Sequence, residues 1–543
     1  MNGYDVVAKI LKAEGVEFLS AFPMQPLIDA CAKIGIRPII CRQERAGVNI
    51  ADGYSRTLNG RKFGVFSMQN GPGAENCFAG VAQAFADSVP MLILPGGEPL
   101  SRQGIAPTFE ARRNFQHVTK WAAQIHKVED IPRLMRHAVT QMKSGRPGPV
   151  MLEMPGDVMK TEYPGDEVEY TPVRRRESLA SPEDVRELIE ALLKSSSPII
   201  VAGQGVLYSQ ASTELVEFSE LAQLPVMTTL AGKSAFPENH PLALGTGGLT
   251  APLTVRRFLE STDFGLGIGT SFTRNTFTTP MPDGLTLGQV TNCSEDIGKD
   301  YEVSVGAVGE VRLVLQQMIE EYKRQDGPKQ RGNGQGVAQK VAAVREEFNT
   351  EWEPRLTSDE VPISPYRVFW ELDLAFGDNI IITHDSGFPR NQLTPTWKSI
   401  SPRSYISWGK STQLGYGLGL SIGAKLAAPE KQVVNIMGDA AFGMSGLDLE
   451  TAVRCKIPIL TVVLNNAKMT GYDDYHPVAT ERYKINLLGG NYSKVAEGLG
   501  AHTERVDDPS NLAAAIKRAE AANREGQAAL LEVLTKVEKK VAK

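Results

Sequence analysis

The sequence predicts an α/β protein made of three doubly wound domains, each built on a parallel sheet. The chain has 543 residues, of which 42% are hydrophobic, so it is long enough to form several cores. Short runs of β-branched residues alternate with helix-like stretches, as in βαβ units. Several of these runs are apolar throughout, which is typical of strands that are buried on both faces of a parallel sheet.

The first domain is expected to span residues 1–165. The segments "IRPIIC", "KFGVFSM" and "PMLILPGG" predict strands at 36–41, 62–68 and 90–97. The segments "ERAGVNIADGYSRTLNG" and "GPGAENCFAGVAQAFADS" predict the helices between them. Polar, proline-containing sequence from Pro164 to Pro182 indicates a linker.

A central domain is expected at 182–325 and a third domain at 340–543. The central strands are predicted within "PIIVAGQGV", "LPVMTTLAG" and "DFGLGIGTSF". The stretch "RQDGPKQRGNGQG" (324–336) is expected to be a flexible linker. In the third domain, "NIIITHDSG", "QVVNIMGDA" and "ILTVVLNN" predict strands that each end at polar residues. The first and third blocks share a size and a βα rhythm, which indicates two related domains.

Composition excludes several classes of protein. A net charge of -5 without a long basic run argues against a nucleic-acid partner. No apolar run reaches the length of a membrane span, and the amphipathic start "MNGYDVVAKILKAEGVEF" is unlike a signal peptide. The five cysteines lack the paired spacing of a zinc or dithiol site. We therefore expect a cytoplasmic protein without a membrane partner.

Polar residues follow two of the predicted third-domain strands. Asp439 follows "VVNIM", and Asn466 closes "LTVVLNN" 27 residues later, with a helix-like stretch between them. Because the carboxyl ends of parallel strands lie side by side, we expect their oxygens to approach one point. A carboxylate and an amide oxygen suit Mg²⁺ better than zinc, while Gly438, Ala440 and Ala441 leave the backbone open to a phosphate. Either dipeptide alone is common loop chemistry, but the spacing predicts a magnesium-diphosphate clamp.

Three motifs resemble those of a known family. "MGDAAF…VVLNN" is similar to the thiamine-diphosphate fingerprint. "CRQERAGVNIADGYSR" and "QNGPGAENCFAGVAQAFADSVPMLIL" resemble the pyrimidine-binding domain of acetohydroxyacid (acetolactate) synthases and related 2-oxo acid decarboxylases. "STQLGYGLGLSIGAKLAAPEKQVV" resembles the stretch that leads into the metal motif. The resemblance covers nearly the whole chain and implies pyrimidine-binding, central and pyrophosphate-binding domains in that order.

The resemblance implies a catalytic role for Glu44. Taken alone, a glutamate at the start of a helix is more often a surface residue that stabilises the helix dipole. In the family, the matching glutamate hydrogen-bonds N1′ of the aminopyrimidine. A proton shift at N1′ turns the exocyclic amine into the base that removes the C2 proton of the thiazolium. We therefore expect Glu44 to be the catalytic acid.

The resemblance also implies the remaining cofactor contacts. Leu414 matches the bulky residue that packs beneath the bent cofactor, although an ordinary core leucine is physically almost the same. The other implied contacts are backbone groups of Gln413 and Leu414 at the pyrimidine, a diphosphate loop at Gly387 and Phe388, and Mg²⁺ ligands from Asp439, Asn466 and the Lys468 carbonyl.

The substrate pocket departs from the family pattern. Gln69, followed by Asn70, stands where simple decarboxylases often have a histidine. A neutral amide binds a substrate but does not donate a proton as imidazolium does, which favours a carboligase and makes Gln69 a candidate catalytic residue. Amides that cap the "NGPG" turn are an equally good interpretation. Met24 and Gln25 stand in "AFPMQPL" where the synthases carry a glycine-rich turn.

Two smaller departures concern the metal motif. Ala440 replaces the usual third glycine, a change that we expect to leave binding intact. Gly471 stands one residue later than the usual glycine after the asparagines, which puts the local pocket geometry in question.

These features predict an enzyme that uses thiamine diphosphate and Mg²⁺, an acetolactate-synthase-like carboligase (transferase or lyase) with a 2-oxo acid donor. FAD is possible but not favoured, because "VAGQGV" and "GIGTSF" lack a full G-x-G-x-x-G and "GTSFTRNTF" matches the flavin pattern poorly. The resemblance implies a homodimer or homotetramer with the active site between subunits.

Three alternatives stay open. The first is a simple 2-oxo acid decarboxylase, or a C–C lyase or hydrolase acting on another carbonyl compound. The second is a catalytically silent cofactor-binding homologue, disfavoured because Glu44, Asp439 and Asn466 are all present. The third is a nicotinamide dehydrogenase, disfavoured by the missing fingerprint.

Overall fold

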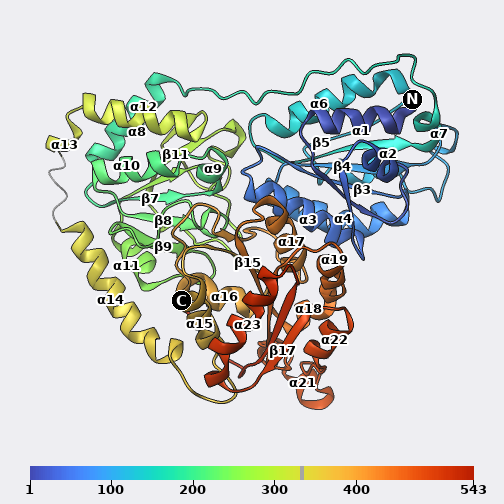
Figure 1. Ribbon diagram of the computed structural model, residues 1–543. Coiled ribbons are helices and arrows are strands. Elements are labelled where there is room, and N and C mark those ends of the chain that lie inside the picture. Colours follow the sequence, from blue (N-terminus) through green and yellow to red (C-terminus); the bar gives the residue numbers. More distant parts are fainter. Residues whose placement is uncertain (331–335) are drawn as a thin grey trace.

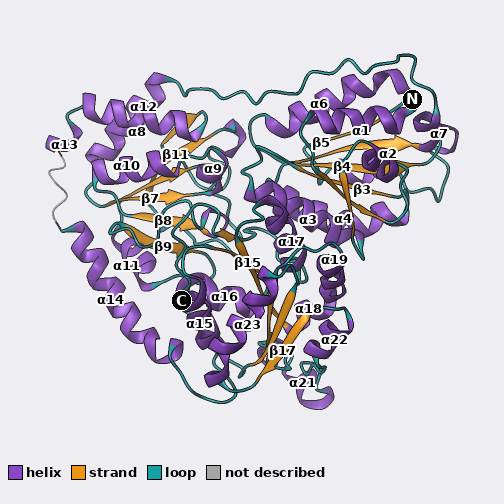
Figure 2. Cartoon of the chain, viewed as in Figure 1, coloured by secondary structure: helices purple, strands orange, loops and turns teal. Residues whose placement is uncertain are grey.

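The computed structural model describes residues 1–330 and 336–543, and contains three α/β domains (Figure 1). Each domain has one six-stranded sheet, and every strand pair in the three sheets is parallel. Figure 2 shows helices on both sides of the sheets. The predicted fold class is therefore confirmed, whereas the exact domain boundaries stay a prediction.

The first sheet has the strand order β2-β1-β3-β4-β6-β5. Its strands are β1 (Phe18–Phe22), β2 (Arg37–Ile40), β3 (Gly64–Met68), β4 (Met91–Gly97), β5 (Trp121–Gln124) and β6 (Pro149–Pro155). Its helices are α1 (Gly3–Ala13), α2 (Leu27–Lys33), α3 (Glu44–Thr57), α4 (Pro72–Ala86), α5 (Ala111–Phe115), α6 (Ile131–Lys143) and α7 (Gly156–Lys160). One core lies between the sheet and α1, α2 and α6, and a second core, under α3 and α4, continues into the third domain.

The third sheet repeats the strand order of the first, β14-β13-β15-β16-β18-β17. Its strands are β13 (Ile380–His384), β14 (Tyr405–Ile406), β15 (Gln432–Gly438), β16 (Leu460–Asn465), β17 (His502–Val506) and β18 (Ala529–Leu534). Its helices are α15 (Pro365–Phe376), α16 (Phe388–Thr396), α17 (Gly417–Ala427), α18 (Asp439–Ser445), α19 (Leu449–Arg454), α20 (Tyr472–Tyr475), α21 (Pro477–Tyr483), α22 (Tyr492–Gly498) and α23 (Leu512–Arg524). The shared order supports the expectation that these two domains are related.

The central sheet has the order β12-β11-β10-β7-β8-β9, which is that of a dinucleotide-binding fold. Its strands are β7 (Pro198–Ala202), β8 (Val226–Thr229), β9 (Ala243–Gly247), β10 (Phe264–Ile268), β11 (Thr286–Thr291) and β12 (Val305–Val308). Its helices are α8 (Pro182–Lys194), α9 (Gln204–Tyr208), α10 (Ser212–Ala222), α11 (Leu253–Ser261) and α12 (Val311–Arg324).

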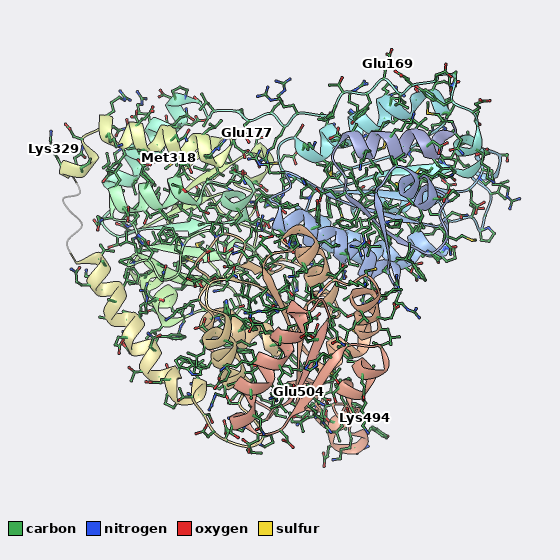
Figure 3. The ribbon with its side chains drawn as sticks, in the orientation of Figure 1. Glu169, Glu177, Met318, Lys329, Lys494 and Glu504 are labelled. Atoms are coloured by element: carbon green, nitrogen blue, oxygen red, sulfur yellow. The ribbon has the colours of Figure 1, made fainter. Side chains whose placement is uncertain are left out.

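Two connections join the domains. The first runs along the top of the molecule and contains Glu169 and Glu177, which Figure 3 labels. Glu177 forms ion pairs with Arg61 of the first domain at 3.0 Å and with Arg312 of α12 at 3.2 Å. The second contains α13 (Gly327–Gln330) and the long helix α14 (Val337–Leu356), which descends toward the third domain (Figure 1). The linker predicted at 324–336 therefore includes a short helix, and its residues 331–335 lie outside the described residues.

The first and third domains pack through α3 and α17. A Cβ atom on Gly419 would lie 2.8 Å from the Ala46 carbonyl oxygen, and one on Gly423 would lie 2.1 Å from the Ile50 carbonyl oxygen. Only glycine allows the two backbones to approach so closely. Gly423 lies one turn after Gly419 in α17, and its neighbour Ile50 lies one turn after Ala46 in α3. The two helices therefore run in the same direction. The beginning of α3 consequently lies beside the loop that precedes α17.

A buried ion network reinforces this interface. Arg56 of α3 is 1% exposed and pairs with Asp52 and with Asp87. Its guanidinium also donates to the Tyr416 hydroxyl and to the Ser407 carbonyl of the third domain. Buried charges of this kind need partners on every side, so the network fixes how the two domains fit together.

The described part of the chain contains no helix long and apolar enough to cross a membrane. All five cysteines carry free thiols, and all but Cys293 are buried. Burial raises the pKa of the Cys31 thiol to about 12, so this thiol is not a nucleophile. The buried cysteines serve as small packing residues.

Candidate active site

The ends of β15 and β16 lie side by side, as the sequence pattern predicted. The two strands are neighbours in the sheet, with Gly438 paired to Leu464. Asp439 begins α18 directly after β15, and Asn466 follows β16. Burial raises the pKa of the Asp439 carboxyl, and the backbone N–H groups of Ala467 and Lys468 lie close enough to oppose that rise, so the two strand ends are near each other.

The residues at this point fit a hard cation. Oδ2 of Asp439 is buried and has no hydrogen-bond partner among the described residues, while Oδ1 accepts the Ala440 N–H at 2.8 Å. The Asn466 side chain is oriented by its own loop: Oδ1 accepts the Lys468 N–H and Nδ2 donates to Thr470, both at 3.0 Å. An amide oxygen has a second lone pair for a metal. An unpaired carboxylate oxygen, an amide oxygen and main-chain carbonyls are ligands that suit Mg²⁺.

This site contains one carboxylate, so it differs from sites built on acidic and histidine clusters. Within the ranges 1–330 and 336–543, no group of three or more His, Cys, Asp or Glu side chains is placed to hold a metal. Burial raises the pKa of the Asp439 carboxyl, against the opposing effect of the backbone N–H groups around it. A bound cation would offset that burial, because it supplies the missing positive charge.

The other asparagine of the pair, Asn465, has different neighbours from Asn466. Asn465 donates to Oε1 of Glu532 at 2.7 Å and accepts the Ala467 N–H at 3.0 Å. Oε2 of Glu532, a fully buried residue of β18, accepts the Ser493 N–H at 2.9 Å. Asn465 is therefore a structural residue that shapes the loop, and Asn466 is the one free to face a ligand. Glu532 was not among the residues predicted from the sequence, although a single acid in the apolar strand "ALLEVL" is a signal of a buried partner.

The backbone around the predicted diphosphate loop is open. A Cβ on Gly438 would meet only Pro389, at 3.7 Å, and one on Gly387 would meet only Pro389, at 3.8 Å. Phe388 begins α16, next to this space. A Cβ on Gly471 would lie 3.5 Å from the Phe388 ring, so the late glycine that the sequence singled out borders the same loop. Ala440 and Ala441 form the first turn of α18 beside it. These residues leave room for a diphosphate.

Glu44 lies at the carboxyl edge of the first sheet. It is the first residue of α3 and is only 3% exposed. Asn76 of α4 donates to its Oε2 at 3.2 Å. Burial raises the pKa of the Cys41 and Cys77 thiols, and the nearby charge of Glu44 adds a smaller increase. One carboxylate oxygen is thus fixed by Asn76, and Oε1 is left for a ligand. The contribution of Asn76 depends on how α3 packs on α4, so it was not predictable from the sequence.

The neighbouring strand ends carry the predicted pocket amides. Gln25 donates to the Met68 carbonyl oxygen at 3.1 Å, and Asn70 donates to Glu98. These two amides therefore have structural partners, whereas the choice between a substrate-binding and a turn-capping role for Gln69 stays a prediction. Gln69 is half-buried at the end of β3, and Met24 is 79% exposed on the loop after β1. Gln69 and Met24 are thus the residues of this group that are available to a substrate.

The structure brings the Glu44 and Leu414 segments against each other within one chain. Gln43 donates to the Met444 carbonyl at 3.3 Å, and the Arg42 N–H donates to Asp448 at 2.8 Å. Arg45 approaches the loop before α17, since a Cβ on Gly415 would lie 3.0 Å from its guanidinium. In that loop, Gln413 donates to the Ala79 carbonyl of α4, and Leu414 packs on the core that the two domains share. The roles proposed for these residues toward a cofactor stay predictions.

The central domain has a separate cavity of about 130 Å³ at the carboxyl ends of β7, β8 and β10. Gly203, Gly205, Thr270 and Ser271 line it, together with Lys410 from the third domain. Lys410 donates to Ser271 at 3.0 Å, and burial lowers its pKa to about 8. The expectation that this domain works without an essential flavin stays a prediction.

Comparisons with known proteins agree with this architecture. Three family models match in sequence order: the N-terminal TPP-binding domain of thiamine pyrophosphate enzymes at 1–126, their central domain at 185–318, and their C-terminal TPP-binding domain at 385–533. A probable acetolactate synthase large subunit from Methanococcus aeolicus is 31% identical over 96% of this chain and 90% of its own length. Glyoxylate carboligase from Escherichia coli O157:H7 is 28% identical over 96% and 91%, and the acetolactate synthase large subunit of Lactococcus lactis is 27% identical over 95% and 90%. The chain therefore belongs to the thiamine pyrophosphate enzyme family, as a thiamine-diphosphate-dependent enzyme related to acetolactate synthase and glyoxylate carboligase.

Proposed function

We propose that this protein is a Mg²⁺-dependent carboligase that decarboxylates a 2-oxo acid donor and joins the remaining acyl group to a carbonyl acceptor. The observation that carries the proposal is the first-domain edge beside Glu44, where the loops after β1, β3 and β4 supply amides, a methionine and a glutamate but no imidazole. The names of the two kinds of relative, acetolactate synthase and glyoxylate carboligase, support the same reaction class.

The cofactor residues follow from the third-domain edge. Bound thiamine diphosphate supplies a thiazolium carbon that adds to a carbonyl and a ring that accepts the electron pair released by decarboxylation. Asp439, Asn466 and the carbonyl of Lys468 would hold Mg²⁺. The open backbone at Gly387, Phe388, Gly438, Ala440 and Ala441 would accept the diphosphate.

The pyrimidine side of the site uses residues of both domains. Glu44 would hold a proton at N1′, and Asn76 keeps its carboxylate in one orientation through Oε2. Leu414 would pack beneath the cofactor, and the backbone of Gln413 would contact the pyrimidine. Burial of Glu44 excludes water from the site of proton transfer.

Carboligation is favoured because the first-domain loops beside Glu44 supply no imidazole that could donate a proton for the alternative outcome. Release of a free aldehyde needs rapid protonation, and neither Gln69 nor Asn70 carries an acidic proton. Glu98 is engaged with Asn70. His384, at the end of β13, is fully buried, and burial lowers its pKa to about 3, so it is neutral at physiological pH. An acceptor carbonyl in the pocket would therefore compete well for the donor carbon.

Proton NMR of the reaction products tests this proposal. The protein, thiamine diphosphate and Mg²⁺ are mixed with a panel of 2-oxo acids, with and without aldehyde or 2-oxo acid acceptors. We expect one acid to be consumed and a 2-hydroxyketone or an acetohydroxyacid to form. Free aldehyde as the main product in the presence of acceptor would contradict the proposal and favour a simple decarboxylase. Asp439→Ala, which removes the proposed metal ligand, is the negative control.

We further propose that the enzyme is a homo-oligomer whose sites combine two subunits, in the reducing environment of the cytoplasm. Large apolar side chains are exposed on the third domain near the proposed site, which supports a partner surface there: Met444, Leu447, Tyr475, Val478 and Tyr483. The free cysteines support the compartment.

Hybrid oligomers test the shared site. Glu44→Gln and Asp439→Ala variants, each inactive alone, are mixed after mild dissociation and reassociated. If a site combines Glu44 of one subunit with Asp439 of another, each hybrid dimer contains one intact site and activity returns. If both residues act within one chain, every site carries a defect, the mixture stays inactive, and the proposal is wrong.

A further inference from the structure

Asp385 is a buried carboxylate that contacts two loops of the proposed cofactor site. It follows β13 and is fully buried. Its Oδ1 accepts the N–H groups of Ser386 at 2.8 Å and Gly415 at 2.9 Å, and its Oδ2 accepts the Gly417 N–H at 2.8 Å. The carboxylate thus joins the beginning of the predicted diphosphate loop to the turn that contains Leu414.

Two glycines, Gly415 and Gly417, further restrict the backbone of the turn at Leu414. Gly415 adopts a φ of +82°, a conformation that side chains other than glycine rarely take. A Cβ on Gly417 would lie 2.5 Å from the Asn435 side-chain oxygen and 3.0 Å from the His384 carbonyl oxygen. The backbone on the C-terminal side of Leu414 is therefore pressed against the sheet, and Asp385 supplies its hydrogen bonds there.

Keeping Asp385 ionised in the folded protein costs free energy, because its charge is buried. Burial raises its pKa to about 6, while the three backbone N–H groups and, more weakly, Arg45 of α3 act in the opposite direction. His384, the preceding residue, is neutral, since burial lowers its pKa to about 3. Buried charges often contribute specificity of conformation rather than stability. Because backbone N–H groups donate to both carboxyl oxygens, only the ionised carboxylate accepts all of these hydrogen bonds well.

We propose that Asp385 is a positioning residue of the thiamine diphosphate site, whose carboxylate fixes Leu414 relative to the diphosphate loop at Gly387 and Phe388. This inference rests on the roles proposed above for Leu414, Gly387 and Phe388. With thiamine diphosphate bound, Asp385 would hold these two contacts at a fixed separation. It would thereby influence the reactivity of the cofactor without touching it.

Asp385→Asn is the main test variant. The amide keeps one acceptor oxygen but turns an NH₂ group either toward the N–H groups of Ser386 and Gly415 or toward the N–H of Gly417, so at least one backbone hydrogen bond is lost. Because a shift of about 1 Å costs about 100-fold in a positioned reaction, we expect C2 proton exchange of bound cofactor to slow by about 10- to 100-fold. The exchange is followed by NMR after acid quench, in deuterated buffer at saturating thiamine diphosphate and Mg²⁺, without substrate.

Hydrogen exchange of the cofactor-free protein supplies an independent readout. Peptides that cover 411–418, measured by mass spectrometry, should lose protection in Asp385→Asn. The matched control is Asp263→Asn in the central domain, where a carboxylate likewise accepts two backbone N–H groups, from Ser196 at 2.6 Å and Ser197 at 2.9 Å. The control should leave both the 411–418 peptides and C2 exchange as in the wild type.

A second variant covers the case in which Asp385→Asn does not fold. Gly415→Ala keeps the carboxylate but strains the same turn, because of its φ and because the new Cβ would lie 3.1 Å from Ser445. It should also slow C2 exchange. A folded variant of either kind that exchanges C2 within twofold of the wild-type rate would overturn the inference. Since no substrate is present, failure of the carboligase proposal leaves this result unaffected, and the two failures are distinguishable.

Discussion

Replacing Gly423 with alanine tests whether the α3–α17 contact within one chain fixes the segments that carry Glu44 and Leu414. The new Cβ would lie 2.1 Å from the Ile50 carbonyl oxygen and 2.7 Å from the Tyr54 nitrogen. Both neighbours are backbone atoms of α3, so no rotamer change relieves the clash. The two helices must separate by roughly 1 Å to restore ordinary contact distances.

The magnitude follows from two opposing terms. Overpacking a tight interface costs about 1–3 kcal/mol, and a clash with backbone places this substitution at the upper end. Replacing glycine with alanine in a helix interior returns about 1 kcal/mol. We therefore expect a net destabilisation of about 2 kcal/mol. Because the same helices carry the Glu44 and Leu414 segments at their beginnings, turnover should also fall.

Gly498→Ala in α22 is the matched control. A Cβ at this position would have no neighbour within 4 Å, so this alanine should be neutral or stabilise the helix by up to about 1 kcal/mol. Thermal unfolding midpoints and C2 exchange of bound cofactor are compared for the two variants. If Gly423→Ala is as stable as Gly498→Ala and exchanges C2 at the wild-type rate, the packing argument is wrong.

Three further predictions follow from the buried charges. Glu44→Gln should slow turnover by about 100- to 10,000-fold, because it removes the acid at N1′. Its affinity for thiamine diphosphate, measured by calorimetry, should stay close to that of the wild type. A variant with normal turnover would exclude Glu44 from catalysis. Arg56→Met should destabilise the protein by about 3–5 kcal/mol, because Asp52 and Asp87 lose their shared partner, and a thermal midpoint equal to that of the wild type would contradict this. The pKa of Asp385, about 6, lies above its unfolded value, so folding favours its neutral form. Its contribution to the stability of the cofactor-free protein should therefore fall by up to about 3 kcal/mol as pH rises from 4 to 6. Asp385→Asn should lack that slope in denaturation curves, and parallel curves for the two proteins would refute the assignment.

Much of the fold was predictable because parallel strands leave a strong signal. The runs that became β3, β4, β13, β15 and β16 are rich in apolar residues and end at or next to glycine or polar residues. The two-residue strand β14 left no such pattern, and its place in the sheet depends on hydrogen bonds to β13 alone. The second strand of the third domain was therefore not predictable from local sequence.

Some residues of the candidate site were likewise predictable from the sequence, and others were not. Asp439 and Asn466 were placed together because the rule for parallel strand ends needs only the order of β15 and β16. Asn76 and Asp385 reach their partners across helix and loop packing, in pairs that are 32 and 30 residues apart in sequence. Such contacts depend on tertiary structure, so they were not predictable from the residue types of a local motif.

Formation of a carbon–carbon bond is the central claim, and isotope labelling tests it most directly. The 2-oxo acid consumed in the panel is supplied with ¹³C at its carbonyl carbon, and the acceptor with ¹³C at its own carbonyl carbon, in the presence of thiamine diphosphate and Mg²⁺. A carboligase produces a product with a new one-bond ¹³C–¹³C coupling, and we expect that coupling to appear with the wild type and to be absent with Glu44→Gln. Label that accumulates only in an uncoupled aldehyde, at saturating acceptor, would contradict the account.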